Sequence, residues 1–378
     1  MTTDLALRPH LAINAQRLIG ERTGVGRYLS CLLREWAQME LPFGEVRLYS
    51  RTPIPVAVLP ERHAYRLQVI PSCASMAIWE HWALGRAASE ADVLFCPSDV
   101  VSLAYRGPVG VTVHDTVLEL FPSMFPWHVR WRRSWLKRYS VKRAQCVLTV
   151  SSSSKRDIER VYGVESSRIH AVPLAADKAF FRASAEDEAK VRERYELGKD
   201  RFVLFVGKFS RRRNLPALIR AFSQLHTDVA AKYILALAGP NYLTLPLAEL
   251  GRKCGMGNSL RLLGYVPDND LPGLYRGAEI FVYPSDYEGF GLPILEAMAA
   301  GTPVITVNSS SVPEVAGDAA ILLPAATVEH LAAAMAALMT DATLRLEYVA
   351  RGREQARRFS WEETARKTIA ILAQIAGV

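Results

Sequence analysis

Two glutamates eight residues apart, Glu288 and Glu296, follow a short apolar run and frame a loop that contains glycine. The segment is predicted to pass from a strand through this loop into a helix that opens at Pro293 and closes before Gly301, since proline suits a first helical turn and glycine suits a helix exit. The backbone amides at such a helix start form an anion-binding site, and glycine lets the backbone approach a ligand closely. The loop residues expected to contact a ligand are Gly289, Phe290, Gly291 and Leu292.

This arrangement indicates recognition of a diphosphate together with the groups attached to it. A carboxylate at Glu296 is suited to accept hydrogen bonds from a ribose diol, and Glu288 is expected nearer the group beyond the phosphates. The alternative is an ordinary helix whose early glutamate offsets the helix dipole, and for Glu296 taken alone that alternative is favoured.

A second set of candidates consists of cations. Lys208 and Arg213 lie in FVGKFSRRRNLPALIRAF (205–222), directly after a predicted strand. When a bond to a nucleotide diphosphate breaks, the leaving group gains negative charge, and fixed cations can neutralise it where no DxD-type motif is placed to hold a metal. We therefore expect no metal and no other cofactor. The alternative is a solvated basic loop. Arg211 and Arg212 are adjacent, and the basic side chains of this segment cannot all face one ligand.

Three further candidate residues lie in the first half of the chain. Gly24 and Gly26 are expected between the first strand and the following helix, where an ordinary turn is the alternative. His114 follows the apolar run at 109–113 and is expected to hydrogen-bond a sugar or a developing charge; a satisfied buried histidine is the alternative. Asp115 is expected to orient the loop.

These segments resemble the retaining GT-B glycosyltransferases of family 4. EGFGLPILEAMAAGTPVI followed by SSVPEVAGDAA (310–320) is similar to that family's E-x7-E signature, and GKFSRRRN is similar to its G-[R/K]-x4-[K/R]-N segment with the two basic residue types exchanged. The resemblance implies that Glu296 holds the ribose, that Glu288 lies beside the donor sugar, and that Lys208 and Arg213 stabilise the leaving group.

The resemblance extends to other segments. TGVGRYL (23–29) and VTVHDTVLELFP (111–122) resemble mannosyltransferase-like members, although those relatives usually carry an aspartate at the position of Asn14. LLGYVPDNDLPGLYRGAE (262–279) implies that backbone near Tyr265 and Val266 borders the nucleotide base. In the same segment, Asp268 and Asp270 are expected in a turn and at a helix N-cap. The implied reaction transfers a hexose, with GDP-mannose as the first candidate donor, and retains the anomeric configuration by front-face attack.

Short apolar runs that alternate with helical patterns predict the elements that carry these residues. Such runs between helices are typical of parallel strands in doubly wound α/β sheets. A second series of apolar runs alternating with helical patterns begins after residue 200. We therefore predict two Rossmann-like domains, residues 1–177 and 178–357, with a last helix in 358–378 that crosses back to the first domain. The GT-B resemblance places the site in the cleft between the two domains, at the carboxyl ends of their strands. The predicted strands are 10–14, 92–96, 109–113, 146–150, 201–207, 233–239, 260–264, 280–284 and 303–307.

The net charge of +8 is concentrated in one segment. No acid occurs from Leu120 to Arg156, whereas this stretch holds nine basic residues, which indicates an anionic partner. Within 127–143, aromatic residues at a four-residue spacing form one face of a predicted helix, and basic residues lie off that face. Contact with an anionic membrane is one interpretation, and an aromatic stripe packed on its own sheet is the other. The aromatic residues are Trp127, Trp131, Trp135 and Tyr139, and the basic ones are Arg132, Arg133, Lys137 and Lys142.

The remaining composition restricts the class of protein. Five scattered cysteines with no CxxC pair argue against a disulfide framework or zinc ribbon. The absence of an apolar signal segment or spanning run predicts a cytoplasmic enzyme, peripheral at most to the inner face of the membrane. The expected partners are a nucleotide-sugar donor and a glycan, lipid-linked or small-molecule acceptor, not nucleic acid. A sugar phosphorylase on the same scaffold and a non-catalytic basic protein that binds membrane or nucleic acid are the alternatives.

Overall fold

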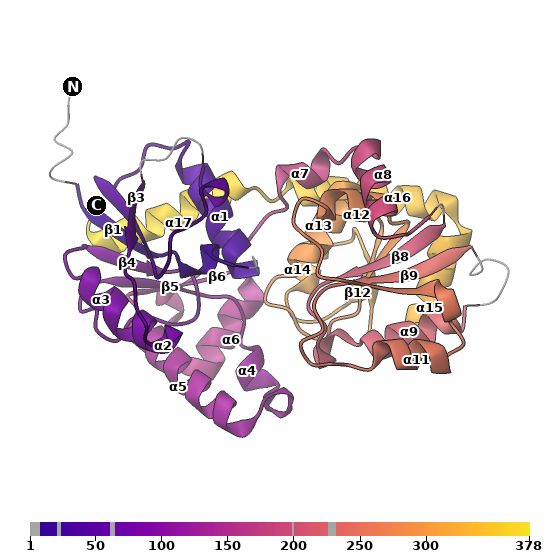
Figure 1. Ribbon diagram of the computed structural model, residues 1–378, viewed down its shortest axis with the longest axis horizontal. Coiled ribbons are helices and arrows are strands. Elements are labelled where there is room, and N and C mark those ends of the chain that lie inside the picture. Colours follow the sequence, from indigo (N-terminus) through magenta and orange to yellow (C-terminus); the bar gives the residue numbers. More distant parts are fainter. Residues whose placement is uncertain (1–7, 21–23, 61–64, 199, 226–231) are drawn as a thin grey trace. The chain divides into compact units, whose positions relative to one another are not determined.

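A computed structural model describes residues 8–20, 24–60, 65–198, 200–225 and 232–378 (Figure 1). The chain divides into two compact units, one formed by Met1–Leu174 with Ser360–Val378 and the other by Ala175–Phe359. These limits lie within three residues of the predicted boundaries at 177/178 and 357/358.

The first unit is built on a parallel sheet with strand order β3-β2-β1-β4-β5-β6-β7. The order changes direction between β1 and β4, as in doubly wound folds. The strands are β1 (His10–Asn14), β2 (Glu45–Ser50), β3 (Tyr65–Val69), β4 (Val93–Cys96), β5 (Val109–Val113), β6 (Cys146–Thr149) and β7 (Ile169–Ala171).

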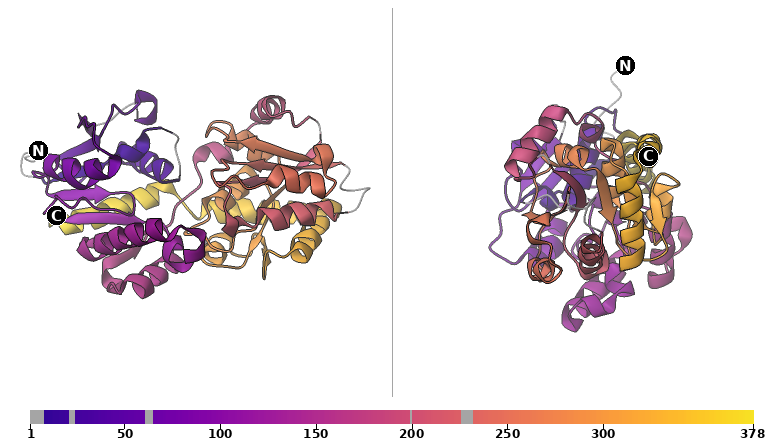
Figure 2. Two further views of the ribbon diagram at one scale, coloured as in Figure 1. Left: turned by 60° about the horizontal axis from the view of Figure 1, so that its bottom comes forward. Right: turned by 90° about the vertical axis from the view of Figure 1, so that its right-hand side faces the viewer.

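Helices flank this sheet on both faces (Figures 1 and 2). The longest described helix of the unit, α5 (Trp127–Arg143), follows the short α4 (Val117–Leu120). The others are α1 (Gly24–Trp36), α2 (Met76–Ile78), a π-helical turn (Trp79–Ala83), α3 (Leu84–Ala87), α6 (Ser152–Tyr162) and α17 (Trp361–Ala376).

Two helices of this unit begin at a serine whose hydroxyl caps the first turn. Ser151 accepts a hydrogen bond from the amide of Ser154 at the start of α6, and Ser360 accepts one from the amide of Glu363 at the start of α17. The C-terminal helix α17 packs on α1, where the indole of Trp36 donates to the carbonyl oxygen of Ala365 at 2.9 Å. The C-terminal helix therefore belongs to the first unit.

The second unit contains a parallel sheet with strand order β10-β9-β8-β11-β12-β13. The order changes direction between β8 and β11, so the carboxyl ends of these two strands border the crevice where ligands bind in open α/β sheets. The strands are β8 (Arg201–Val206), β9 (Tyr233–Ala238), β10 (Leu260–Gly264), β11 (Ile280–Tyr283), β12 (Val304–Val307) and β13 (Ile321–Leu323).

Its core is formed by the near-continuous apolar strands β8, β9, β11 and β12, which are buried on both faces as expected for a covered parallel sheet. The helices are α7 (Lys178–Phe181), α8 (Ala185–Arg194), α9 (Leu215–Ser223), α11 (Leu247–Lys253), α12 (Leu271–Gly277), α13 (Leu292–Ala300), α14 (Val312–Ala316), α15 (Val328–Thr340) and α16 (Ala342–Arg357). No helix among the described residues is both long and apolar enough to cross a membrane.

Candidate active site

The candidate site of the second unit begins at the carboxyl end of β8. The chain leaves the strand through Gly207, whose φ of +147° lies in a region that side chains rarely adopt. A Cβ at this position would collide with the guanidinium of Arg213, so glycine is required for that side chain to fold back over the strand end. Arg213 donates from Nη1 to the carbonyl oxygen of Lys208 at 2.7 Å. The basic segment therefore forms a compact turn rather than a solvated loop.

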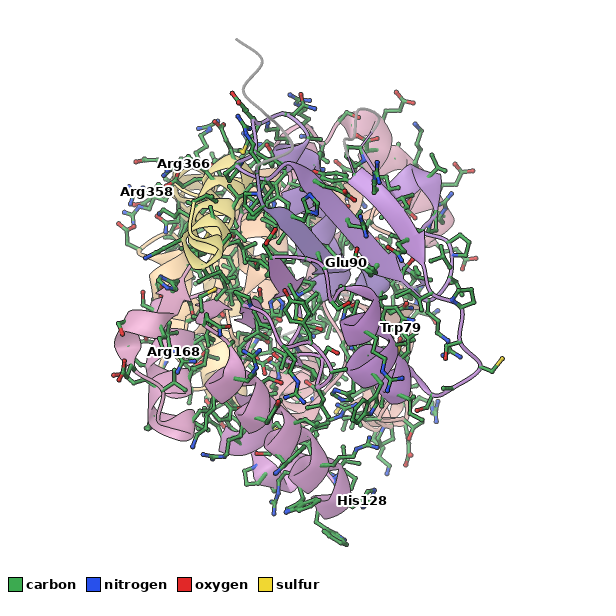
Figure 3. The ribbon with its side chains drawn as sticks, turned by 90° about the vertical axis from the view of Figure 1, so that its left-hand side faces the viewer. Trp79, Glu90, His128, Arg168, Arg358 and Arg366 are labelled. Atoms are coloured by element: carbon green, nitrogen blue, oxygen red, sulfur yellow. The ribbon has the colours of Figure 1, made fainter. Side chains whose placement is uncertain are left out.

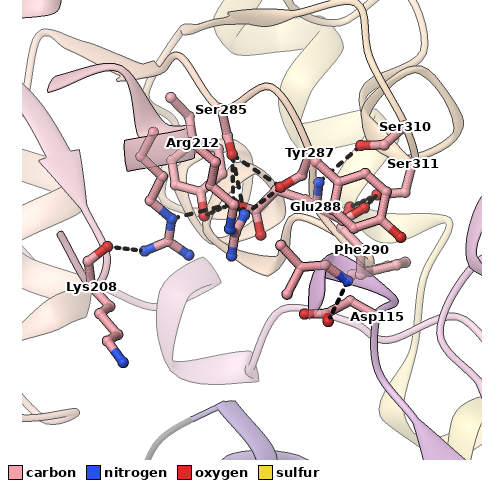
Figure 4. Close-up of polar contacts among 12 residues, drawn as sticks. Asp115, Lys208, Arg212, Ser285, Tyr287, Glu288, Phe290, Ser310 and Ser311 are labelled. Carbon is pink, nitrogen blue, oxygen red and sulfur yellow. Dashed lines mark hydrogen bonds and ion pairs between the residues drawn. The ribbon is translucent and has the colours of Figure 1, made fainter. Parts of the chain in front are cut away.

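Arg212 and Arg213 both bind the carboxylate of Glu288 (Figure 4). Arg213 Nε lies 3.2 Å from Glu288 Oε1, and Arg212 Nη1 contacts the same oxygen. The hydroxyls of Tyr283 and Ser285 donate to this oxygen at 2.9 and 2.8 Å. In the described part of the chain, every side-chain contact of this carboxylate involves Oε1.

Glu288 is thereby held as an anion. Its side chain is buried, and burial alone would raise the pKa of the carboxyl group. The charges of Arg212 and Arg213 and the hydrogen bond from Ser285 oppose this effect and lower the pKa of Glu288 to about 2. A carboxylate of this kind accepts hydrogen bonds at neutral pH and does not act as a general acid.

Glu288→Gln is expected to flatten the pH dependence of the free energy of unfolding in acid. The folded pKa lies below the unfolded value of 4.5, so the stabilisation is fully present above pH 4.5 and is lost as the pH falls toward 2. Complete loss corresponds to about 3 kcal/mol. Urea denaturation of both proteins between pH 3.5 and 7 measures the difference. Parallel curves for the two proteins would show that Glu288 carries no such stabilisation.

Two serines fix the loop after Glu288, and neither of them was assigned a role from the sequence. The hydroxyl of Ser310 accepts a hydrogen bond from the amide of Glu288 at 2.9 Å. The hydroxyl of Ser311 contacts the carbonyl oxygens of Glu288 and Phe290, each at 2.9 Å. Both serines come from the segment after β12, so two strand ends together shape the loop. Gly289, Phe290 and Gly291 are buried within it.

The helix after this loop differs slightly from its prediction. It begins at Leu292, one residue before the predicted Pro293, with Gly291 in the left-handed region at φ +98° as its N-cap residue. It ends before Gly301, as predicted, and Gly301 is also left-handed at φ +85°. The start of α13 thus has the glycine-then-proline order that the anion-site prediction requires.

Glu296 lies in the second turn of α13, and no acidic residue occupies the first turn. The dipole-offsetting alternative is therefore disfavoured by position. Its side chain is buried, and Oε2 accepts a hydrogen bond from the hydroxyl of Tyr275 at 3.0 Å. Its contact with a ribose stays a prediction.

Further predicted positions follow neighbouring strands of the same sheet. Lys208 is exposed after β8, and its ammonium group lies 5.0 Å from the ring centroid of Tyr242, which follows β9. Tyr265 is exposed and Val266 is buried after β10. All these side chains belong to the carboxyl edge of one sheet, as predicted for a ligand site.

The prediction for Asp270 was partly wrong. Asp270 occupies the N-cap position of α12, but its side chain does not cap the helix. The carboxylate instead accepts hydrogen bonds from Arg194 and from the hydroxyl of Tyr195, both at 2.7 Å. A charged donor nearby competes with the backbone amides for the carboxylate.

The first unit holds a separate polar group at the carboxyl ends of its strands. Asn14 at the end of β1 donates from Nδ2 to Glu80 Oε1 at 3.3 Å, and Arg17 lies 3.6 Å from the same oxygen. His114, after β5, is half-buried; its Nε2 bonds the carbonyl oxygen of Pro97 at 2.9 Å, and its ring meets Tyr28 edge-on at 5.1 Å. One ring nitrogen of His114 is thus engaged, and its role toward a sugar stays a prediction.

Asp115, Gly24 and Gly26 are the remaining predicted residues of the first unit. Asp115 accepts from the amide of Val117 at 3.1 Å and so orients its loop, as expected. Gly24 and Gly26 lie in the first turn of α1, which corrects their predicted place before the helix. Thr23 of the same motif lies outside the described residues.

Comparisons with known proteins agree with this geometry. The family model described as "Glycosyltransferase Family 4" matches residues 22–180, and the model described as "Glycosyl transferases group 1" matches residues 187–355.

Among the described residues, no group of three or more His, Cys, Asp or Glu side chains is placed to hold a metal ion.

Curated relatives include several mannosyltransferases. The chain is 36% identical over 263 residues to O-antigen chain mannosyltransferase B of Escherichia coli, which is 68% of either chain. It is 28% identical over 282 residues to the MMP alpha-(1->4)-mannosyltransferase of Mycolicibacterium hassiacum, covering 70% of this chain and 64% of that one. It is 29% identical over 265 residues to the serotype-specific mannosyltransferase WbdA of Escherichia coli, which is 68% of this chain but 32% of that longer protein.

Solved structures share the fold along almost the whole length. HepE from Anabaena in complex with UDP and glucose superposes with a TM-score of 0.78 at 17% identity, covering 97% of this chain and all of the other (100%). WaaG, a glycosyltransferase involved in lipopolysaccharide biosynthesis, gives a TM-score of 0.75 at 17% identity, with 96% and 99% covered. The predicted α/β architecture with two Rossmann-like domains of the GT-B type is confirmed.

Proposed function

Because the chain belongs to glycosyltransferase family 4, we propose that it transfers mannose from GDP-mannose to a glycan or lipid-linked acceptor, with retention and without a metal. The observation that carries this proposal is the ionised Glu288, which two arginines hold at the carboxyl end of β11 next to the start of α13. The mannosyltransferases among the relatives support the choice of sugar.

In the proposed reaction the bond between the anomeric carbon and the diphosphate oxygen breaks, and a bond to the acceptor oxygen forms on the same face of the sugar. The acceptor proton passes to the departing diphosphate. Lys208 neutralises the charge that grows on this leaving group, together with the start of α13. Arg213 also contributes positive charge that stabilises the leaving diphosphate. In addition it binds the carboxylate of Glu288, a second role that the sequence did not indicate.

Glu288 and Glu296 have different tasks in this proposal. The Oε2 atom of Glu288 accepts hydrogen bonds from mannose hydroxyls, since the contacts to cations and hydroxyls use Oε1. Glu296 accepts from the ribose, and the backbone near Tyr265 and Val266 borders the base. His114 binds the sugar, and the small residues Gly24 and Gly26 leave room for the phosphates and acceptor.

The charge and aromatic residues of α5 support a location at the membrane surface. Trp127, Trp131 and Trp135 are 75%, 71% and 53% exposed, so the alternative of an aromatic stripe packed on its own sheet is wrong for the three indoles. Lys137 is an exception to the predicted solvated basic face, because it is buried between Asp99, at 3.3 Å, and the carbonyl oxygen of Asp115. We propose a cytoplasmic enzyme that contacts an anionic membrane through the exposed part of α5.

Calorimetric titration of GDP, UDP, ADP and dTDP without divalent metal tests the donor assignment. GDP is expected to bind in the micromolar range, and Glu296→Ala is expected to weaken it by about 10- to 100-fold, because hydrogen bonds to a charged acceptor are lost. Glu296→Gln keeps an acceptor for the hydroxyl of Tyr275, and its affinity for GDP is expected to lie between those of the wild type and Glu296→Ala.

Glu354→Ala, an exposed glutamate on α16 of the same unit, is the matched control. Failure of all four nucleotides to bind would contradict the transferase assignment. Equal GDP affinity of wild type and Glu296→Ala would remove the ribose contact.

A further inference from the structure

A cavity of about 610 Å³ lies between α4, α5 and α6 of the first unit. Its volume is within the range of small-molecule pockets. Figure 3 shows this part of the molecule, where His128 marks the first turn of α5. The cavity is lined by Leu118, Glu119, Pro122, Arg130, Trp131, Ser134, Trp135, Arg138 and Val161.

The walls of this cavity are largely apolar. Its one acidic residue, Glu119, has both carboxylate oxygens buried, and neither accepts a hydrogen bond from another described residue. Burial opposes the charged form of Lys137, yet the carboxylates of Asp99, Asp115 and Glu119 raise the pKa of Lys137. Leucine, proline, valine and two indoles supply most of the remaining surface. Such a lining suits a hydrocarbon better than a sugar ring, which needs converging hydrogen-bond partners.

Arginines line the cavity and lie next to it along α5. Arg138 donates to the carbonyl oxygen of Val161 at 3.1 Å, and its guanidinium lies 5.6 Å from the ring centroid of Tyr162. Arg130 also lines the cavity, and Arg132 and Arg133 are exposed on the same helix. The stretch from Leu120 to Arg156 contains no acid, and Glu119 is the one acidic residue of the lining. This charge is complementary to a phosphate headgroup.

The exposed indoles supply a third, independent feature. Trp131 and Trp135 each line the cavity with one part and reach solvent with another, and Trp127 continues the stripe by one turn. Tryptophan is the residue that membrane–water interfaces favour, because its ring is apolar and its N–H is polar. A largely apolar cavity, arginines and exposed indoles thus occur together on α5.

We propose that this cavity receives one hydrocarbon chain of an anionic phospholipid while the arginines of α5 bind its phosphate. Trp131 and Trp135 flank the inserted chain. The inference rests on the membrane contact proposed above and adds to it a specific lipid site, so that the enzyme holds one lipid rather than only adsorbing to a charged surface.

Quenching of tryptophan fluorescence by phosphatidylglycerol with brominated chains, in vesicles with phosphatidylcholine, tests the proposal on the full chain. Ser134→Phe fills the cavity but keeps every charge and indole. It is expected to weaken vesicle binding at least about tenfold and to reduce quenching of the bound protein, since each buried methylene contributes to affinity. Ser134→Ala is the matched control and is expected to behave as wild type.

Arg132→Ala with Arg133→Ala is expected to lower vesicle affinity by about fivefold for each charge while leaving the quenching of bound protein unchanged. Wild-type quenching in Ser134→Phe at unchanged affinity would overturn the chain site and leave simple adsorption. Binding of soluble mannose oligosaccharides that Ser134→Phe abolishes would overturn it in favour of a glycan site. No wild-type binding to anionic vesicles would overturn the membrane contact itself. Mannose transfer to a water-soluble acceptor tests the proposed reaction separately.

Discussion

Lys208→Ala is expected to lower kcat for sugar transfer by about 10²- to 10³-fold while changing the KM for the acceptor little. The ammonium group acts on charge that develops as the diphosphate leaves, so its loss raises the barrier rather than weakening the acceptor complex. Because the side chain of Lys208 is exposed and does not pack in the core, its removal is expected to leave the fold unaffected. Steady-state kinetics with varied acceptor at saturating donor measures both constants.

Lys253→Ala is the matched control, because Lys253 is an exposed lysine of the same unit whose ion pair among the described residues is with a helical neighbour, Glu249, at 2.7 Å. Lys208→Arg is expected to recover part of the rate, since the charge returns in a different geometry. Near-normal turnover in Lys208→Ala would remove its role toward the leaving group.

Glu288→Ala is expected to abolish measurable transfer and to destabilise the second unit by about 3–5 kcal/mol. The substitution leaves the guanidinium groups of Arg212 and Arg213, one half-buried and one buried, without their shared carboxylate, and an uncompensated buried charge is costly. It also removes the acceptor of the Tyr283 and Ser285 hydroxyls.

The two units allow this loss to be located. All seven tryptophans belong to the first unit, so indole fluorescence follows that unit whereas circular dichroism follows both. Urea denaturation of Glu288→Ala should show an early transition by circular dichroism that fluorescence lacks.

Glu363→Ala is the control, because Glu363 also pairs with two cations, Arg366 and Lys367, but on an exposed surface where such pairs contribute little. Equal stability of Glu288→Ala and Glu363→Ala would contradict the structural role of the buried cluster.

Much of the fold could be predicted from apolar runs. All nine predicted strands are present within one residue of their predicted ends, since each is a short, largely apolar run between helical segments. The four strands without a prediction, β2, β3, β7 and β13, lack that pattern. β2 and β3 carry charged residues such as Glu45, Arg47 and Arg66, which form ion pairs with one another, and β7 and β13 have only three residues each at sheet edges.

The candidate site could be predicted only in part. Motif spacing identified Glu288, Lys208 and Arg213, because those residues follow strand ends. It did not reveal that Arg212 shares Glu288 with Arg213, since three adjacent arginines look alike in sequence and only the turn after β8 decides which ones face inward. Likewise, Lys137 has the helical spacing of an exposed residue, and its burial depends on carboxylates from two other loops.

Transfer from isotopically labelled GDP-mannose to a mannose-terminated oligosaccharide, followed by NMR in the presence of EDTA, tests the central claim most directly. The predicted result is a new mannoside whose anomeric configuration matches that of the donor, formed with release of GDP and lost in Lys208→Ala. An inverted product would contradict retention. Phosphate-dependent cleavage of a disaccharide, with no transfer from any nucleotide sugar, would contradict the assignment as a glycosyltransferase.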